Sequence, residues 1–81
     1  MIDKNTYINL KHEIKAMSRN NVLKLCDDMI LNNEERQLLI NFYDNKMVIH
    51  TCMELNIGTM TYNRHIKKLF AKINNYKNTL T

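Results

Sequence analysis

The chain has 81 residues, of which 44% are hydrophobic and 25% charged, so it has room for one small domain with one modest core. A single glycine and the absence of proline argue against β-sandwiches, glycine-rich phosphate loops and flexible linkers. The formal net charge of +4 suits a polyanionic partner, and the composition favours an all-α fold, a small bundle of about five helices.

Several other classes of protein are excluded by what the sequence lacks. No stretch approaches the ~20 apolar residues of a membrane span, and no signal peptide precedes Leu10, so we expect a cytoplasmic protein with no membrane partner. Cys26 and Cys52 form no CxxC motif, no histidine lies near them at metal-ligand spacing, and both fall at apolar positions of helical patterns. We therefore expect buried thiols and neither a metal nor a cofactor.

Residues 1–30 predict two N-terminal helices. The first runs from about Asp3, a plausible N-cap, to Met17, and the second from Ser18 to about Ile30. Apolar residues recur at helical spacing in both. They are Tyr7, Leu10, Ile14 and Met17 in the first helix, and Val22, Leu25, Cys26 and Met29 in the second.

Residues 31–75 predict three more helices in the same single domain. Asn32 and Glu35 have capping-box spacing for a third helix that ends at Asp44–Asn45, and a short fourth helix spans about Met47 to Leu55. Asn56 suits a left-handed turn, Ile57 is expected to plug that turn into the core, and a fifth helix follows over about 59–73. Asn74–Asn75 is expected to end it, which leaves residues 76–81 as a tail.

The fifth helix is apolar on one side and basic on the other. All acidic residues of the chain lie at or before Glu54, so the last third is purely cationic. At 100° per residue the core stripe consists of Tyr62, Ile66, Leu69, Phe70 and Ile73. The opposite face carries Met60, Arg64, Lys67, Lys68 and Ala71, with Thr61 and Asn63 on its flanks.

The segment from Leu31 to Ile73 resembles the helix-turn-helix of sigma-factor region 4 and of LuxR (GerE)-type regulators. The matching positions are Leu31, Glu35, Arg36, Leu38, Leu39, Cys52, Leu55-Asn56-Ile57, Thr61-Tyr62, His65-Ile66, Phe70 and Ile73. The chain departs from the pattern at Thr51 (usually Ile), Met47 (often a phosphate-binding Ser or Thr), Asn56 (commonly Gly) and Tyr62 (usually Val). Only about six residues follow the expected fifth helix, so we do not expect a LuxR-type dimerisation helix. The two extra helices lie upstream, which favours a sigma region 4-like regulator of the small phage or plasmid kind.

The resemblance implies a sequence-specific transcription regulator whose fifth helix enters the major groove of double-stranded DNA. Arg64 can bind guanine in a bidentate way and Asn63 is a candidate for adenine. Lys67 and Lys68 are expected to bind phosphates. The other candidates are expected to contact thymine methyl groups or phosphates, and they are Thr59, Met60 and Thr61. Tight binding by so small a domain would require a homodimer or a partner such as RNA polymerase.

Two other interpretations remain open. The chain could be a phage- or plasmid-encoded module that binds RNA polymerase or another host protein, and Met47 and Met60 favour this alternative. The first helix could offer Tyr7, Leu10 and Ile14 to a dimer or partner, or could pack them into the domain's own core. We expect no enzyme, because neighbouring acidic residues diverge on a helix and no nucleophile–His–acid set is evident.

Overall fold

The computed structural model describes residues 3–79, which form five α-helices and no strand. The helices are α1 Lys4–Ala16, α2 Arg19–Asp28, α3 Asn33–Tyr43, α4 Val48–Leu55 and α5 Thr59–Thr79. The predicted small all-α bundle of about five helices is confirmed. No helix in the described part of the chain is both long enough and apolar enough to cross a membrane.

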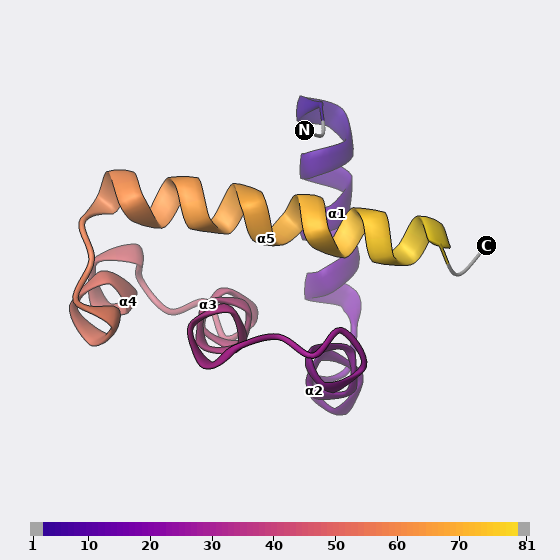
Figure 1. The fold of residues 1–81 in the computed structure, drawn as a ribbon, viewed down its shortest axis with the longest axis horizontal. Helices are drawn as coiled ribbons and strands as arrows, with labels where there is room; N and C mark the ends of the chain where they lie inside the picture. The colour runs from indigo at the N-terminus through magenta and orange to yellow at the C-terminus, as the bar shows by residue number, and fades with distance from the viewer. Residues whose placement is uncertain (1–2, 80–81) are drawn as a thin grey trace.

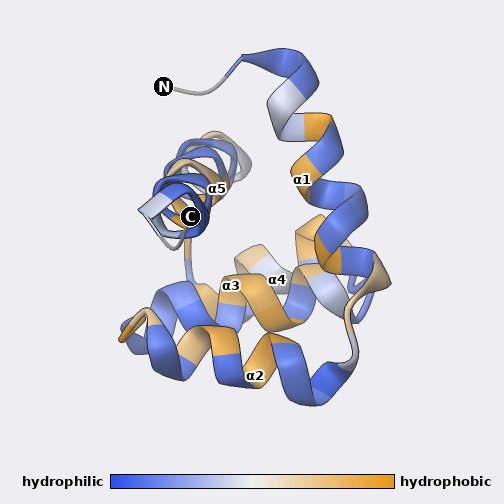
Figure 2. Cartoon of the chain, turned by 90° about the vertical axis from the view of Figure 1, so that its right-hand side faces the viewer, coloured by the Kyte–Doolittle hydropathy of each residue, from blue (hydrophilic) through white to orange (hydrophobic). Residues whose placement is uncertain are grey.

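Helix α5 is the central element of the bundle. Its 21 residues span about 32 Å at 1.5 Å per residue, and the molecule measures 37 × 27 × 21 Å. In Figure 1, α5 lies along the longest axis, α1 crosses it, and α2, α3 and α4 lie on one side of it. Viewed along α5, α1 stands beside it and the other helices lie below (Figure 2), so one side of α5 is left uncovered.

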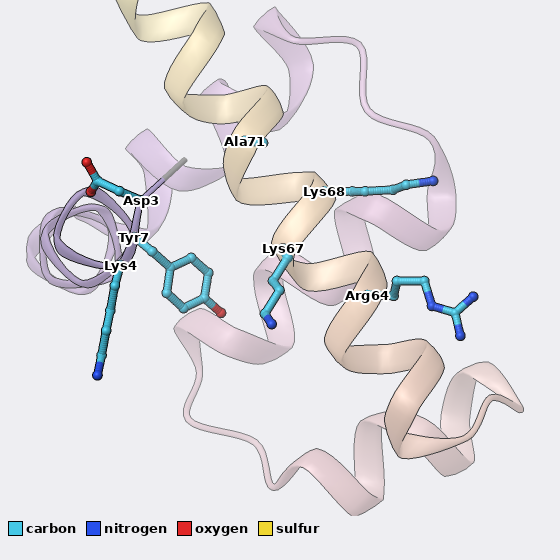
Figure 3. Close-up of a pocket in the computed structure, with 7 residues that line it drawn as sticks. All are labelled: Asp3, Lys4, Tyr7, Arg64, Lys67, Lys68 and Ala71. Carbon is cyan, nitrogen blue, oxygen red and sulfur yellow. The ribbon is translucent and has the colours of Figure 1, made fainter. Parts of the chain in front are cut away.

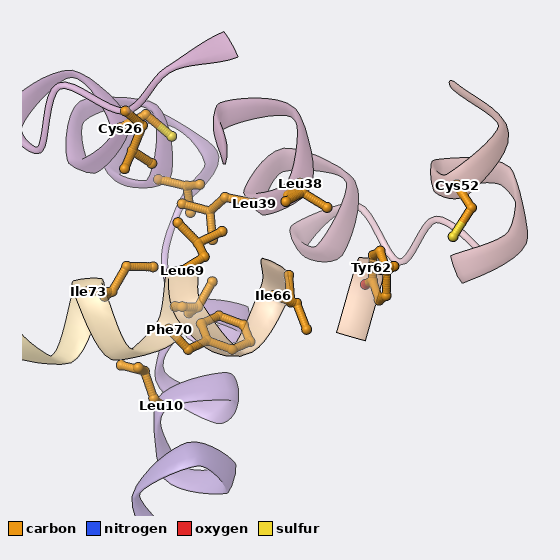
Figure 4. Packing of buried hydrophobic residues seen from close by; sticks show 13 residues of the cluster. Leu10, Cys26, Leu38, Leu39, Cys52, Tyr62, Ile66, Leu69, Phe70 and Ile73 are labelled. Carbon is orange, nitrogen blue, oxygen red and sulfur yellow. The ribbon is translucent and has the colours of Figure 1, made fainter. Parts of the chain in front are cut away.

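One hydrophobic core joins all five helices. Phe70 is fully buried and makes edge-on ring contacts with Tyr7 and Phe42, at centroid distances of 5.2 and 5.1 Å. Figure 4 shows the α5 side chains facing those of the other helices across this core. The predicted core stripe of α5 is confirmed, because its members are all buried: Tyr62, Ile66, Leu69, Phe70 and Ile73.

The structure settles which of two roles the apolar side of α1 has. Leu10 and Ile14 are buried in the chain's own core, and Tyr7 is half-buried against it. The suggestion that these side chains form a dimer or partner face is therefore wrong for Leu10 and Ile14, because the bundle has already covered them. The alternative, packing within the domain, is confirmed.

Three helices begin at the side-chain caps that the sequence predicts. Asp3 accepts a hydrogen bond from the Thr6 backbone N–H at 2.7 Å, which lowers the pKa of its carboxyl group. Ser18 caps α2 through the backbone N–H of Asn21. The Asn32–Glu35 capping box is present in both directions, at 2.8 and 3.1 Å, so the start of α3 is fixed by local chemistry alone.

Each of the helices α2, α3 and α4 is followed within two residues by a residue in the left-handed region. These residues are Ile30, Asn45 and Asn56, with φ of 53°, 61° and 58°. Asn56 adopts the predicted conformation, whereas α2 stops at Asp28, before the predicted Ile30. Ile30 is 85% exposed and β-branched, an uncommon choice for this region, so its conformation is imposed by the backbone hydrogen bonds that close the helix end.

The predicted end of the fifth helix at Asn74–Asn75 is wrong, because α5 continues to Thr79. Two asparagines lower helix propensity only slightly, and contacts with α1 outweigh them. Lys77 Nζ lies 2.6 Å from Glu13 Oε2 on α1, and Tyr76 is half-buried. Of the predicted tail 76–81, residues 80–81 lie outside the described residues.

Candidate nucleic-acid interface

The uncovered side of α5 carries most of the predicted site. Arg64, Lys67 and Lys68 are exposed, as are Asn63, Met60 and Thr59, whereas Thr61 is half-buried. Arg64, Lys67 and Lys68 line one cleft together with Ala71 and the start of α1. Asn63 lines a second, neighbouring hollow, and Thr59, Met60 and Thr61 line neither. The structure therefore brings the three basic residues together and leaves the first turn of α5 outside the cleft.

The basic side chains of α5 fall into two sets. We call Arg64, Lys67 and Lys68 the outer cations; none of them has a carboxylate partner among the described residues. The inner set consists of His65, Lys72 and Lys77, and each of its members contacts an acid on a neighbouring helix.

The inner set binds α5 to the rest of the bundle. The nitrogen–oxygen distances are 2.5 Å from His65 to Glu34, 3.2 Å from Lys72 to Glu35, and 2.6 Å from Lys77 to Glu13. The Nδ1 atom of half-buried His65 is thus engaged with α3. The uncompensated positive charge of α5 is thus concentrated on its outer side.

A cleft of about 610 Å³ separates the outer side of α5 from the beginning of α1. Its α1 wall is made by Asp3, Lys4 and Tyr7. Figure 3 shows Lys67 extending toward the Tyr7 ring, while Arg64 and Lys68 extend from the other side of α5. The outer cations therefore point in two directions, and a ligand lying over α5 would meet both.

A second hollow adjoins the first at Tyr7, which lines both. Lysines from α1 and from the α3–α4 loop surround it, together with Asn63 of α5 and aromatic side chains. The lysines are Lys11, Lys15 and Lys46. Lys15 Nζ donates a hydrogen bond to the Phe42 carbonyl at 2.5 Å, and Lys46 pairs with Glu54. Lys11 Nζ lies 5.1 Å from the centre of the Tyr7 ring.

These α1 lysines were missed by the sequence interpretation. Lys4, Lys11 and Lys15 are separated by seven and four residues, a spacing that places them on one side of a helix. The pattern was therefore visible in the sequence. What the sequence did not show is that this side of α1 borders the outer side of α5.

A buried polar network holds α4 on α3. Asn41 and Thr51 are both buried, and Asn41 Nδ2 donates to Thr51 Oγ1 at 3.2 Å and to Glu54 Oε1 at 3.5 Å. Gln37 Nε2 donates in turn to Asn41 Oδ1 at 2.7 Å. Thr51, which departs from the usual Ile of the resembled pattern, thus supplies an acceptor for a buried amide that would otherwise cost free energy.

The outer surface of α4 carries several exposed apolar side chains. Met47 precedes the helix and makes no side-chain cap, and Ile49 and Met53 lie one turn apart on an exposed side. Met53 is 73% exposed and Met60, at the start of α5, is 77% exposed. The predicted outward position of Met60 is confirmed. A phosphate-binding hydroxyl is missing at Met47, so any contact of α4 with a polyanion must use backbone groups or neighbouring cations.

The two cysteines take no part in this surface. Cys26 and Cys52 are free and buried, as predicted, and burial raises the pKa of the Cys26 thiol. Within residues 3–79, no three His, Cys, Asp or Glu side chains gather closely enough to hold a metal ion. Comparisons of the chain with protein-family models, curated proteins and solved structures find no match.

Proposed function

We propose that the protein is a sequence-specific DNA-binding transcription regulator that uses a sigma region 4-like helix-turn-helix. In this proposal α4 is the scaffold helix, the turn at Asn56 sets the angle between the two helices, and α5 is the recognition helix in the major groove. The observation that carries the proposal is that Arg64, Lys67 and Lys68, on the uncovered side of α5, have no carboxylate partner among the described residues, whereas the other basic residues of this helix are all paired.

The exposed side chains of α5 divide by the chemistry that each can offer. Arg64 and Asn63 can reach base edges, where a guanidinium recognises guanine and an amide recognises adenine. Met60 and Thr59 offer methyl-bearing groups to thymine. Lys67 and Lys68 suit phosphates, which supply most of the affinity and its dependence on salt.

The proposal is tested by measuring the binding of duplex DNA at increasing salt concentration. A random duplex should bind at low salt, with log K falling linearly as log salt rises, and selection from a random library should yield a preferred sequence. The variant Arg64→Gln/Lys68→Gln should lose this binding. Its matched control, Lys72→Gln/Lys77→Gln, removes the same number of charges from the same helix and should retain it. Absence of binding to any duplex at low salt contradicts the proposal.

A second candidate function is a protein-interaction module for RNA polymerase or another host protein. The exposed apolar residues of α4 favour it, because Met-rich exposed surfaces commonly bind protein partners. The two functions differ in which residues matter. The second function would be supported over the first by two results together. The unmodified protein would bind RNA polymerase but no DNA, and the variant Ile49→Ser/Met53→Ser would lose the binding to polymerase.

A further inference from the structure

The N-terminal half of α1 stands at the edge of the proposed DNA-binding helix. In Figure 1, α1 crosses α5 and its N-terminal end projects beyond α5 on the side away from α2. The cleft between the two helices is lined by Lys4 and Tyr7 of α1 and by Lys67 of α5. A duplex that receives the outer side of α5 would therefore meet α1 at the border of its groove.

The α1 wall is cationic and almost free of acids. Among the residues that line the two hollows, the one carboxylate is Asp3, whose oxygen is already engaged by the Thr6 backbone N–H at 2.7 Å. Lys4 and Lys11 have no carboxylate partner among the described residues. Two helices that are distant in sequence thus present uncompensated lysines to the same space.

The spacing of these lysines matches a phosphate backbone. Lys4 and Lys11 are seven residues apart, which is about 10.5 Å along a helix axis. One strand of B-DNA carries a charge for about every 3.4 Å of axial rise, so this separation corresponds to about three nucleotides. Lysine is a flexible point charge, and such a charge suits a contact that follows the backbone and reads no base.

We infer that α1 is a second DNA-contacting element. Its Lys4 and Lys11 hold phosphates of the strand that borders the major groove, together with Lys67 of α5, which faces Tyr7 across the cleft. This inference rests on the proposed function. It keeps Lys67 on the backbone and leaves guanine recognition to the other side of α5, where Arg64 extends. Lys15 has a positioning role, because its ammonium group is bound to the end of α3.

The test compares the salt dependence of DNA binding in four proteins. In the variant Lys4→Gln/Lys11→Gln the slope of log K against log salt should be less steep by about one for each lysine removed, and affinity should fall equally on preferred and random duplexes. The Lys4 side chain makes no hydrogen bond or ion pair with another described residue, so Lys4→Gln alone should give half of that change. Lys24→Gln, an exposed lysine of α2, is the matched control and should leave the slope unchanged.

A gain-of-function variant checks the same inference from the other direction. Asp3→Asn keeps an N-cap side chain while removing the one carboxylate of the cleft, so DNA binding should tighten at low salt. If the unmodified protein binds DNA and neither the slope nor the affinity responds to the α1 variants, the inference is overturned and the proposed function stands. If the unmodified protein binds no duplex at low salt, both are overturned.

Discussion

The outer and inner cations of α5 are chemically alike and lie within a few residues of each other, yet the protein uses them differently. Lys68 has no acidic partner among the described residues, whereas Lys72, one turn later, contacts Glu35 of α3. The difference follows from which side of the helix faces the bundle. Helices α1 and α3 hold acids within reach of the inner cations, whereas the described residues include no carboxylate partner for the outer cations. Counting basic residues along the chain therefore overstates the charge that is available to a partner.

We expect the largest effect from a substitution in the core, because the positions of the outer and inner cations both depend on how α5 packs. Phe70→Ala should cost about 3–5 kcal/mol of stability, because it empties the centre of the core and two edge-on ring contacts. That is a large share of the total for a domain of this size, so chemical denaturation should show a strongly lowered midpoint or no folded state. Met60→Ala, on the same helix and exposed, is the control and should change stability by less than about 0.5 kcal/mol.

The next largest effect concerns DNA binding and should differ between the outer cations. Arg64→Ala should cost about 1–3 kcal/mol of binding free energy on a selected DNA site and relax the choice of base, whereas Lys68→Ala should weaken all sequences alike. Gel-shift titrations against the selected site and against a randomised duplex measure both quantities. Equal losses on every sequence for both variants would show that neither residue reads bases.

A comparable effect on stability should follow from breaking the network that holds α4. Thr51→Val removes the better acceptor of the Asn41 amide and leaves only the longer contact to Glu54, so the variant should lose about 1–3 kcal/mol of folding free energy. Urea unfolding followed by circular dichroism measures the change. Thr61→Val, at a half-buried site without such a bond, is the control. An unchanged midpoint for Thr51→Val would mean that the network does not stabilise α4.

The smallest effect tests the inner set directly. Lys72→Ala should lower stability by no more than about 1 kcal/mol, because its ion pair with Glu35 is partly exposed, and it should leave DNA affinity unchanged. Thermal unfolding and the gel shift together check both halves of this expectation. A loss of DNA binding as large as that of Arg64→Ala would erase the distinction between outer and inner cations.

Much of the fold could be predicted because its signals are local. The caps at Asp3, Ser18 and Asn32 and the left-handed turn at Asn56 depend on residues within a few positions of one another. The apolar stripe of α5 follows from helical periodicity in the same way. The failures were at the ends of α2 and α5, where a β-branched residue adopts a left-handed conformation and an ion pair with α1 extends the helix.

The candidate site was predicted only in part. The outward positions of Arg64, Lys67 and Lys68 follow from 100° per residue, and the structure confirms that they are exposed. Periodicity within one helix cannot tell which helix lies beside it. The α1 lysines, the cleft at Tyr7 and the pairing of His65 with Glu34 all depend on contacts between segments distant in the chain.

By itself the sequence determined five amphipathic helices, their starts, the buried side of α5 and the concentration of positive charge after Glu54, because each of these is set by spacing along one segment. Tertiary structure alone decided which cations keep an uncompensated charge. The physical reason is that an ion pair depends on distance in space: α3 and α1 bring carboxylates to two different sides of α5, while its outer side stays uncovered.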